Sequence, residues 1–243
     1  MNIKQTFGNN ILIRLDKDNN FVKLKNGTDL YIDTSFEPEK HTTVTGEVFG
    51  IPKKLLYTGI PNIGMPWKTP MEVKIGDRVV VYYLSILNAL GVYNKDGQQK
   101  SMKAFVEGDD KYVLIEYQNI FAIIRDGVMM PINGYCLIEP MEDPEWTRTK
   151  KRITNAGLIP LKLKEKTNTH VVYGIVRYCG RPNEAYVDNH SDDGVAVNPG
   201  DIVIMKRISD LPLEYDLHAK IDGGKKYWRT QRRKILAVYE KPV

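Results

Sequence analysis

The feature that most constrains the fold is a short pattern that occurs twice. The segment VKIGDRVVVYY begins at residue 73, and VNPGDIVIMKR begins at residue 197, which is 124 residues later. Both place a Gly-Asp step directly before an alternating run rich in β-branched residues. A glycine at that step allows positive φ in a tight turn, and the aspartate can accept backbone N–H hydrogen bonds. The pattern therefore predicts two strands that are entered through the same turn.

The repetition extends along the whole chain. Each half has a first strand, a long polar stretch, a strand containing glycine, a loop, the Gly-Asp strand, a second loop and a closing strand. The offset is 124 residues at the first strand, 128 between Gly46 and Gly174, and 115 between Ala122 and Ala237. Insertions in surface loops explain this drift, because lengthening a loop costs little free energy. The ordered set predicts a duplicated module.

A chain of 243 residues can hold two domains of about 120 residues each. Gly127 and Pro131 mark the boundary, which divides the chain into modules at 1–126 and 127–243. The chain has 19 glycines and 13 prolines, so few stretches can form a helix, and 85–93 is the one segment expected to make two turns. Short apolar runs between turn signals predict an all-β sandwich or barrel. The expected strands are 11–15, 45–51, 77–83, 111–117, 119–124, 134–140, 170–180, 201–207 and 234–239.

Composition narrows the class of protein. The net charge of +5 arises from 35 basic and 30 acidic residues, which is too balanced to indicate nucleic-acid binding by itself. No apolar run is long enough to span a membrane, and the N-terminal MNIKQTFGNN lacks the apolar core of a signal peptide. The two cysteines, Cys136 and Cys179, form no CxxC motif. We therefore expect a cytoplasmic protein with no membrane partner.

Motifs for metal binding and catalysis are not found in the sequence. The four histidines have no ligand spacing with one another or with the cysteines. The acidic stretch at 188–194 departs from the register of a calcium loop. The chain has no P-loop, dinucleotide fingerprint, nucleophile elbow or HExxH motif. These observations predict a non-enzymatic protein without a catalytic residue, a metal or a cofactor of its own.

The order of these strands and motifs, which we call the landmarks, resembles that of the GroES-type co-chaperonins, in tandem form. The resemblance covers almost the whole chain and depends on one order of motifs occurring twice. It implies two tandem GroES-like, partly open β-barrels. The matching residues are Gly46-Glu47-Val48, 73–79 and 120–123 in the first half, and Gly174-Ile175-Val176, 197–203, 220–222 and 235–238 in the second.

The resemblance also implies a function. The protein would be a co-chaperonin that caps a GroEL-type chaperonin and assists ATP-dependent protein folding, with ATP and Mg²⁺ belonging to the chaperonin partner. It would self-associate into a ring. Rings of the family are heptamers, so a chain with two barrels leaves three arrangements open: seven chains, four chains, or a ring that uses one barrel per chain.

In the family, a mobile loop with a glycine and an apolar tripeptide docks on the chaperonin. Burying three aliphatic side chains contributes about 5–9 kcal/mol, and ordering the loop costs about 2–5 kcal/mol, so each contact is weak and the ring binds through avidity. The alternative is that these residues are strand residues packed on the barrel. The positions implied here are Gly157, Leu158, Ile159, Pro160 and Leu161 in the second half, and Leu30, Tyr31 and Ile32, after Gly27, in the first.

A second hypothesis is a structural or assembly module, or a nucleic-acid-associated one, that reuses the same barrel. The stretch KKYWRTQRRK at 225–234 mixes basic and aromatic residues, and RTKKR at 148–152 adds further positive charge. The matching stretch of the first half, KYVLIEYQNI, is not basic. We therefore interpret 225–234 as a solvated strand face and turn, and we do not expect nucleic acid as a partner.

Overall fold

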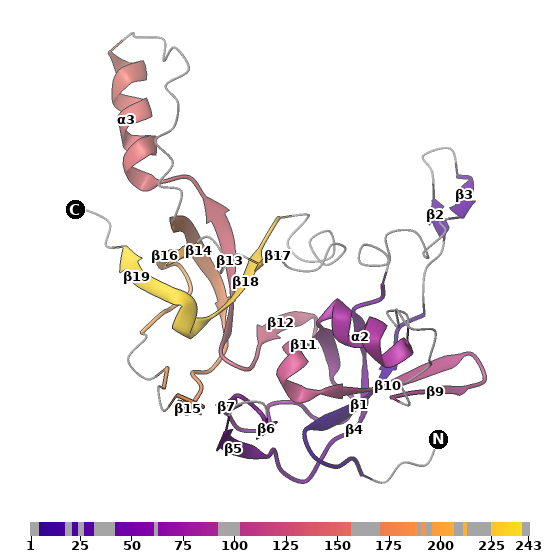
Figure 1. Cartoon of the computed structure of the whole chain (residues 1–243). Helices are drawn as coiled ribbons and strands as arrows, with labels where there is room; N and C mark the ends of the chain where they lie inside the picture. Colours follow the sequence, from indigo (N-terminus) through magenta and orange to yellow (C-terminus); the bar gives the residue numbers. More distant parts are fainter. Residues whose placement is uncertain are drawn as a thin grey trace.

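The computed structural model shows an all-β chain with two large antiparallel sheets, which confirms the expected fold class (Figure 1). Each of the nine expected strands coincides with a strand of these sheets. The structure describes residues 5–17, 21–23, 27–31, 42–60, 63–91, 103–156, 171–188, 191–192, 196–206, 211–212 and 225–239.

The first sheet has the strand order β12-β11-β8-β4-β1-β10-β9, and all its neighbours are antiparallel. Among the described residues it does not close into a barrel, because β12 and β9 are its edges. Its strands are β1 (Asn10–Leu15), β4 (Thr45–Gly50), β8 (Arg78–Val81), β9 (Ala104–Glu107), β10 (Asp110–Glu116), β11 (Ile120–Arg125) and β12 (Val128–Pro131).

The second sheet has the order β17-β18-β13-β14-β16-β19 and is also antiparallel. Its edges in the described part of the chain are β17 and β19, so it too is open there. Its strands are β13 (Tyr135–Met141), β14 (Val171–Cys179), β16 (Ile202–Lys206), β17 (Leu211–Pro212), β18 (Trp228–Gln231) and β19 (Ile235–Tyr239).

Smaller elements complete the described fold. Three two-stranded sheets pair β2 with β3, β5 with β6, and β7 with β15. Their bounds are β2 (Phe21–Lys23), β3 (Asp29–Tyr31), β5 (Tyr57–Ile60), β6 (Ile63–Gly64), β7 (Trp67–Lys68) and β15 (Ala185–Tyr186). The helices are α2 (Tyr83–Leu90), α3 (Pro144–Asn155) and the 3₁₀ helices η1 (Tyr117–Asn119) and η4 (Arg232–Lys234).

The two large sheets share one strand order. The second sheet, followed from β19, runs β19-β16-β14-β13-β18-β17, and the first runs β11-β8-β4-β1-β10-β9 after its edge strand β12. Strands at the same place in this order are also at the same place in sequence within each half. The sheets change over between β12, which ends at Pro131, and β13, which begins at Tyr135. The division at 126/127 stays a prediction, and β12 beyond it pairs with the first sheet.

The Gly-Asp turns of the two halves are bonded alike. In the first, Gly76 has a φ of 88°, and its N–H donates to the Val48 carbonyl at 2.8 Å. The Lys74 N–H donates to Oδ2 of Asp77 at 2.7 Å. The predicted roles of glycine and aspartate are both present. In the second turn φ is 97° at Gly200, whose N–H donates to Val176 at 2.8 Å, and Asn198 N–H donates to Asp201 Oδ2 at 2.7 Å.

The first strands correspond with an offset of 125 residues, so the expected offset of 124 was wrong by one. The Tyr117 N–H donates to the Asn9 carbonyl at 2.7 Å, and the Arg232 N–H donates to the Gly134 carbonyl at 2.9 Å. Asn9 and Gly134 thus occupy the same place. The sequence could not set this register because β1 is buried on both faces, so its side chains show no polar alternation.

Asp77 also ties its turn to β11. Arg125 donates from Nε to Oδ1 of Asp77 at 3.0 Å and from Nη2 to Oδ2 at 2.7 Å. Burial acts to raise the pKa of Asp77, but the hydrogen bonds from Arg125 and the Lys74 backbone outweigh it, so the pKa lies below its ordinary value. A carboxyl with a lowered folded-state pKa contributes stability above its unfolded pKa and loses it as the pH falls through the folded value.

We therefore expect Asp77→Asn to lower the free energy of unfolding by about 1–3 kcal/mol at neutral pH. The difference from the wild type should shrink as the pH falls below about 4, where the wild-type carboxyl also becomes protonated. Urea unfolding of both proteins from neutral pH to below about pH 4 measures this difference in the free energy of unfolding. The control is Asp109→Asn, at a side chain that is 92% exposed and should change little. A loss that is equal at all pH values would contradict the role of the charge.

Helix α2 confirms the helix expected at 85–93, but α3 was not predicted. The residues of α3 lie in the long polar stretch that follows the first strand of the second half. The starting signal was present, since Asp143 precedes Pro144 and Glu145, a typical helix start. The Thr147 N–H and Oγ1 both donate to the Asp143 carbonyl, at 3.0 and 3.1 Å. The helix was missed because its surface is mostly polar and shows no apolar stripe.

Candidate functional site

The segment that joins the two sheets completes the edge of the first. Strand β12 pairs with β11, with Pro131 opposite Ala122. The next residue, Ile132, donates its N–H to the Phe121 carbonyl at 3.0 Å and is 1% exposed, within the core of the first sheet. The first residues of the second half therefore act as the last strand of the first half.

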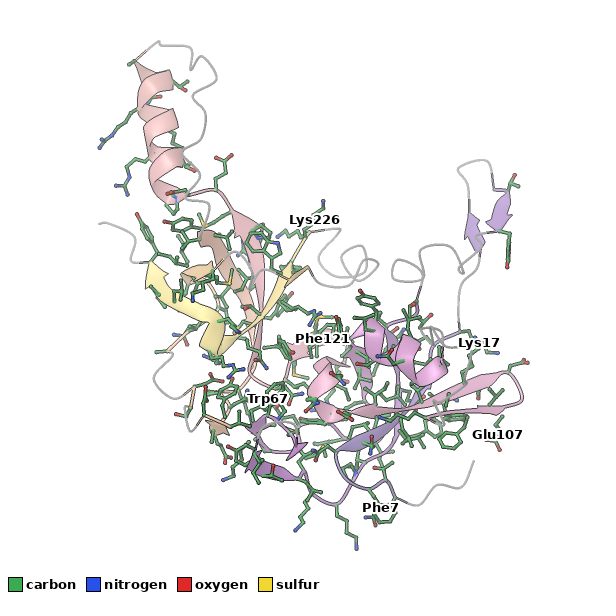
Figure 2. The ribbon with its side chains drawn as sticks, in the orientation of Figure 1. Phe7, Lys17, Trp67, Glu107, Phe121 and Lys226 are labelled. Atoms are coloured by element: carbon green, nitrogen blue, oxygen red, sulfur yellow. The ribbon has the colours of Figure 1, made fainter. Side chains whose placement is uncertain are left out.

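The second sheet covers the face of β8 and β11 that points away from the first sheet's own core. Phe121, which lies between the two sheets in Figure 2, is 1% exposed. The Arg229 guanidinium carbon lies 4.8 Å from the ring centres of both Phe121 and Tyr82. The buried residues of this shared core are Val44, Val80, Phe121 and Ala122 from the first half, Met129 from β12, and Leu137 and Tyr227 from the second sheet.

Polar contacts add to this junction at β7 and β15. Trp67 donates from Nε1 to Oδ1 of Asn133 at 3.1 Å, and Asn183 donates from Nδ2 to the Asn133 carbonyl at 3.0 Å. Lys68 and Glu184 form an ion pair at 2.8 Å. Paired backbones and buried hydrogen bonds make the contact between the two halves a packed interface.

The corresponding face of the second sheet is open. Strands β16 and β19 match β8 and β11 in the strand order, and Ala237 lies opposite Ile204 as Ala122 lies opposite Val80. Leu236, at the position of Phe121, is 51% exposed. No strand pairs with the outer edge of β19 among the described residues. We call this surface the open β19 edge; it comprises Ile204, Leu236, Ala237 and Val238.

The start of the chain matches the segment that covers the first sheet. With the offset of 125, Phe7 corresponds to Ile132 and Thr6 to Pro131. The local hydrogen bond is the same, since Asn10 N–H donates to the Phe7 carbonyl and Tyr135 N–H donates to that of Ile132. Phe7 is nevertheless 77% exposed and points away from the sheet in Figure 2. One chain thus carries an uncovered edge and an exposed Phe7 at the position of the residue that covers the matching edge.

Of the residues expected to contact a chaperonin, the structure describes two. Leu30 and Tyr31 lie on β3, which pairs only with β2 among the described strands. Tyr31 is 61% exposed, so at this residue packing onto a large sheet is not observed. Ile32 and the second-half positions Gly157, Leu158, Ile159, Pro160 and Leu161 lie outside the described residues.

One projecting segment follows the first strand of each half. The β2–β3 hairpin lies between β1 and β4 in sequence, and α3 lies between β13 and β14. Both stand clear of the large sheets, toward the top of the view in Figure 1. Helix α3 exposes Arg148, Lys151 and Arg152. The structure therefore places a protruding segment at the same position in each half.

The interpretation of 225–234 as a solvated face was wrong for part of the stretch. Tyr227, Arg229 and Arg232 are buried. Arg232 donates from Nε and Nη2 to the Gly180 carbonyl at 3.2 and 2.8 Å. The guanidinium of Arg229 contacts aromatic rings and that of Arg232 donates to carbonyl oxygens, so these two arginines are not available to a nucleic-acid backbone. The burial of these arginines could not be predicted, because the aromatic rings and the carbonyl oxygen that they contact are distant along the chain.

Within the described residues we find no group of three or more histidine, cysteine or acidic side chains that could hold a metal ion. A surface hollow of about 280 Å³ lies beside α2 and β10. Its charged residues Lys103 and Glu116 lie 3.6 Å apart and pair with each other, so we assign them no catalytic role. No helix in the described ranges has the length and apolar character needed to cross a membrane.

Comparison with known proteins found no match that bears on the function of this chain. No protein-family model matches the chain, and no curated protein matches its sequence.

Proposed function

We propose that the protein is a non-enzymatic co-chaperonin, built from two GroES-like modules, whose ring caps a GroEL-type chaperonin. The observation that carries the proposal is that one chain has both an open β19 edge and an exposed Phe7 at the position of Ile132, while its two halves share one strand order. ATP and Mg²⁺ would belong to the chaperonin.

Duplication of one module is supported at three levels. The strand order agrees between the sheets, the Gly-Asp turns make the same hydrogen bonds, and a 3₁₀ helix precedes both β11 and β19. Agreement at this level of detail favours a common module over two unrelated sheets. Among the described residues the GroES-like landmarks lie on matching elements, with Gly46 on β4 and Gly174 on β14, and the landmark at 220–222 lies outside the described residues.

The unlike surfaces at Phe7 and at β19 support assembly into a ring. The residues around Phe7 of one chain would pair with the β19 edge of the next, as β12 and Ile132 pair with β11 within a chain. Because the two surfaces differ, the contact is head-to-tail, and such contacts generate closed rings when the rotation permits. The contact within the chain supplies the geometry for the contact between chains. The number of chains is left open by this argument.

The projecting segments would make the contact with the chaperonin. A ring with each module facing the same way would present all β2–β3 hairpins and all α3 segments on one rim. The apolar residues Tyr31 and Ile159 are the expected anchors. Each contact is weak by itself, but several on one rim raise the overall affinity by about 10²–10⁴-fold. Occupying the chaperonin's apolar grooves would displace unfolded substrate into the closed chamber.

Sedimentation with a GroEL-type chaperonin and ATP tests the function. We expect the protein to comigrate with the chaperonin only when nucleotide is present. Ile159→Asp should weaken binding at least about 100-fold, because a carboxylate cannot enter an apolar groove without a partner and the loss repeats around the ring. Val106→Asp is the control, since Val106 is an exposed apolar residue on β9 and belongs to neither projecting segment.

Two results would contradict the proposal. Retained binding by Ile159→Asp would remove that residue from the contact. A wild-type ring that never binds chaperonin would favour the assembly-module alternative, in which the exposed cations of α3 contact a nucleic acid or another shell component. Binding of that kind would weaken steeply as salt is added.

A further inference from the structure

The two cysteines, which are distant in sequence, face each other across the second sheet. Cys136 of β13 lies directly opposite Cys179 of β14, and their Sγ atoms are 2.6 Å apart. Both are free thiols. Opposed residues of an antiparallel pair have Cα atoms about 4.5–5.5 Å apart, within the usual disulfide range of about 4.4–6.8 Å. A bond between them therefore requires little movement of the backbone.

We propose that Cys136 and Cys179 form a thiol–disulfide site, which a low-molecular-weight disulfide of the glutathione class oxidises to a cross-strand disulfide. The inference comes from the register and the distance between the sulfur atoms, and it does not depend on the proposed function.

Exposure assigns the two thiols different roles. Cys136 is fully buried, whereas Cys179 is partly exposed, so a reagent in solution reaches Cys179 first. The hydrogen bond from the Cys136 thiol lowers the pKa of Cys179, and the same bond, together with burial, raises the pKa of Cys136. The buried guanidinium of Arg232, held on the Gly180 carbonyl, also favours a Cys179 thiolate.

The reaction proceeds in two exchanges. The Cys179 thiolate attacks one sulfur of oxidised glutathione, the S–S bond of the reagent breaks, and one reduced glutathione leaves. Cys136 then loses its proton and attacks the Cys179 sulfur, and the second glutathione leaves as a thiol. In sum, two protein thiols are oxidised to one disulfide and one oxidised glutathione is reduced to two thiols.

The site exists in only one of the two matching sheet positions. The corresponding places in the first half hold Ile11 and Ile51, which pack in the apolar core. Oxidation would therefore act on the second sheet alone. The bond would close a loop between residues 43 apart, and this loop contains α3. Closing a loop of that length in the unfolded chain is expected to raise the thermal midpoint by roughly 5–15 °C.

Intact-mass measurement on the folded wild-type chain tests the site. After incubation with excess oxidised glutathione, we expect a loss of two hydrogens, no attached glutathione and the higher thermal midpoint. Dithiothreitol should reverse all three changes. Two thiols that stay free, or a glutathione that stays attached to Cys179, would overturn the proposal.

Two variants separate the steps. Cys136→Ala should stop the reaction at a glutathione attached to Cys179, because the second thiol is missing. Cys179→Ser should leave the buried Cys136 unmodified while the chain is folded. Modification of Cys136 in that folded variant would contradict the assigned order of attack. The wild-type measurement decides the proposal even if either variant folds poorly.

Discussion

Phe7→Asp is expected to convert the proposed ring into single chains and to leave each chain folded. Phe7 is 77% exposed, so its own chain loses little stability when the phenyl side chain is replaced. In the assembly it would take the place that Ile132, 1% exposed, takes in the first sheet. Losing the apolar contact and burying a carboxylate should cost about 3–5 kcal/mol per contact, or more than about 100-fold in affinity. Sedimentation velocity at micromolar concentration measures the change.

The head-to-tail geometry makes a sharper test possible. Leu236→Asp damages the β19 edge and should also yield single chains. When the two variants are mixed, the intact edge of Phe7→Asp chains can receive the intact Phe7 of Leu236→Asp chains, so dimers should form but no rings. Val106→Asp, at a residue 73% exposed on the β9 edge of the first sheet, should assemble normally. Rings of unchanged size from Phe7→Asp would rule out this contact.

Gly46→Ala should destabilise the fold more than any other small change in β4. Gly46 lies opposite Leu15, and a Cβ added there would overlap the Arg14 carbonyl oxygen and the Ile13 Cγ2 methyl. Because backbone is involved, the strands must move apart, at a cost of about 3 kcal/mol. That corresponds to a thermal midpoint lower by roughly 6–12 °C. Gly174→Ala should behave alike, since its Cβ would meet the Glu139 carbonyl oxygen at 2.9 Å and the Ile138 side chain.

Gly50→Ala is the matched control on the same strand. Its Cβ would lie 3.4 Å from side-chain carbons of Leu12 and Thr6, which can shift by a few tenths of an ångström. We expect a change of less than about 1 kcal/mol in the free energy of unfolding. Equal midpoints for Gly46→Ala and the wild type would show that β1 and β4 approach less closely than described.

Much of the secondary structure could be predicted because its causes are local. Alternating β-branched runs between turn residues identified the strands, and the Gly-Asp step identified the turns around Gly76 and Gly200. Helix α3 was missed because a polar surface hid it, although Asp143 and Pro144 marked its start. The β12 strand was missed because a short segment with Pro131 resembles a linker until its partner strand is known.

The candidate site was predictable only in part. The projecting segments lie where the sequence has long polar stretches. Tyr31 is exposed, as a contact residue would be. The chaperonin contact of Leu30, Tyr31 and the second-half loop stays a prediction. Nothing in the spacing of residues indicated that Arg229 and Arg232 are buried, since the rings and carbonyls that hold them belong to distant segments.

The sequence by itself determined the all-β class, the order of the strands along the chain and the two Gly-Asp turns. Each depends on backbone conformation and side-chain alternation within a few residues. The tertiary structure alone decided that Phe7 and Ile132 are equivalent, that no described strand pairs with the outer edge of β19, and that Cys136 faces Cys179. Those facts depend on strand register and on which faces are covered, and a shift of one residue would exchange the faces of a strand.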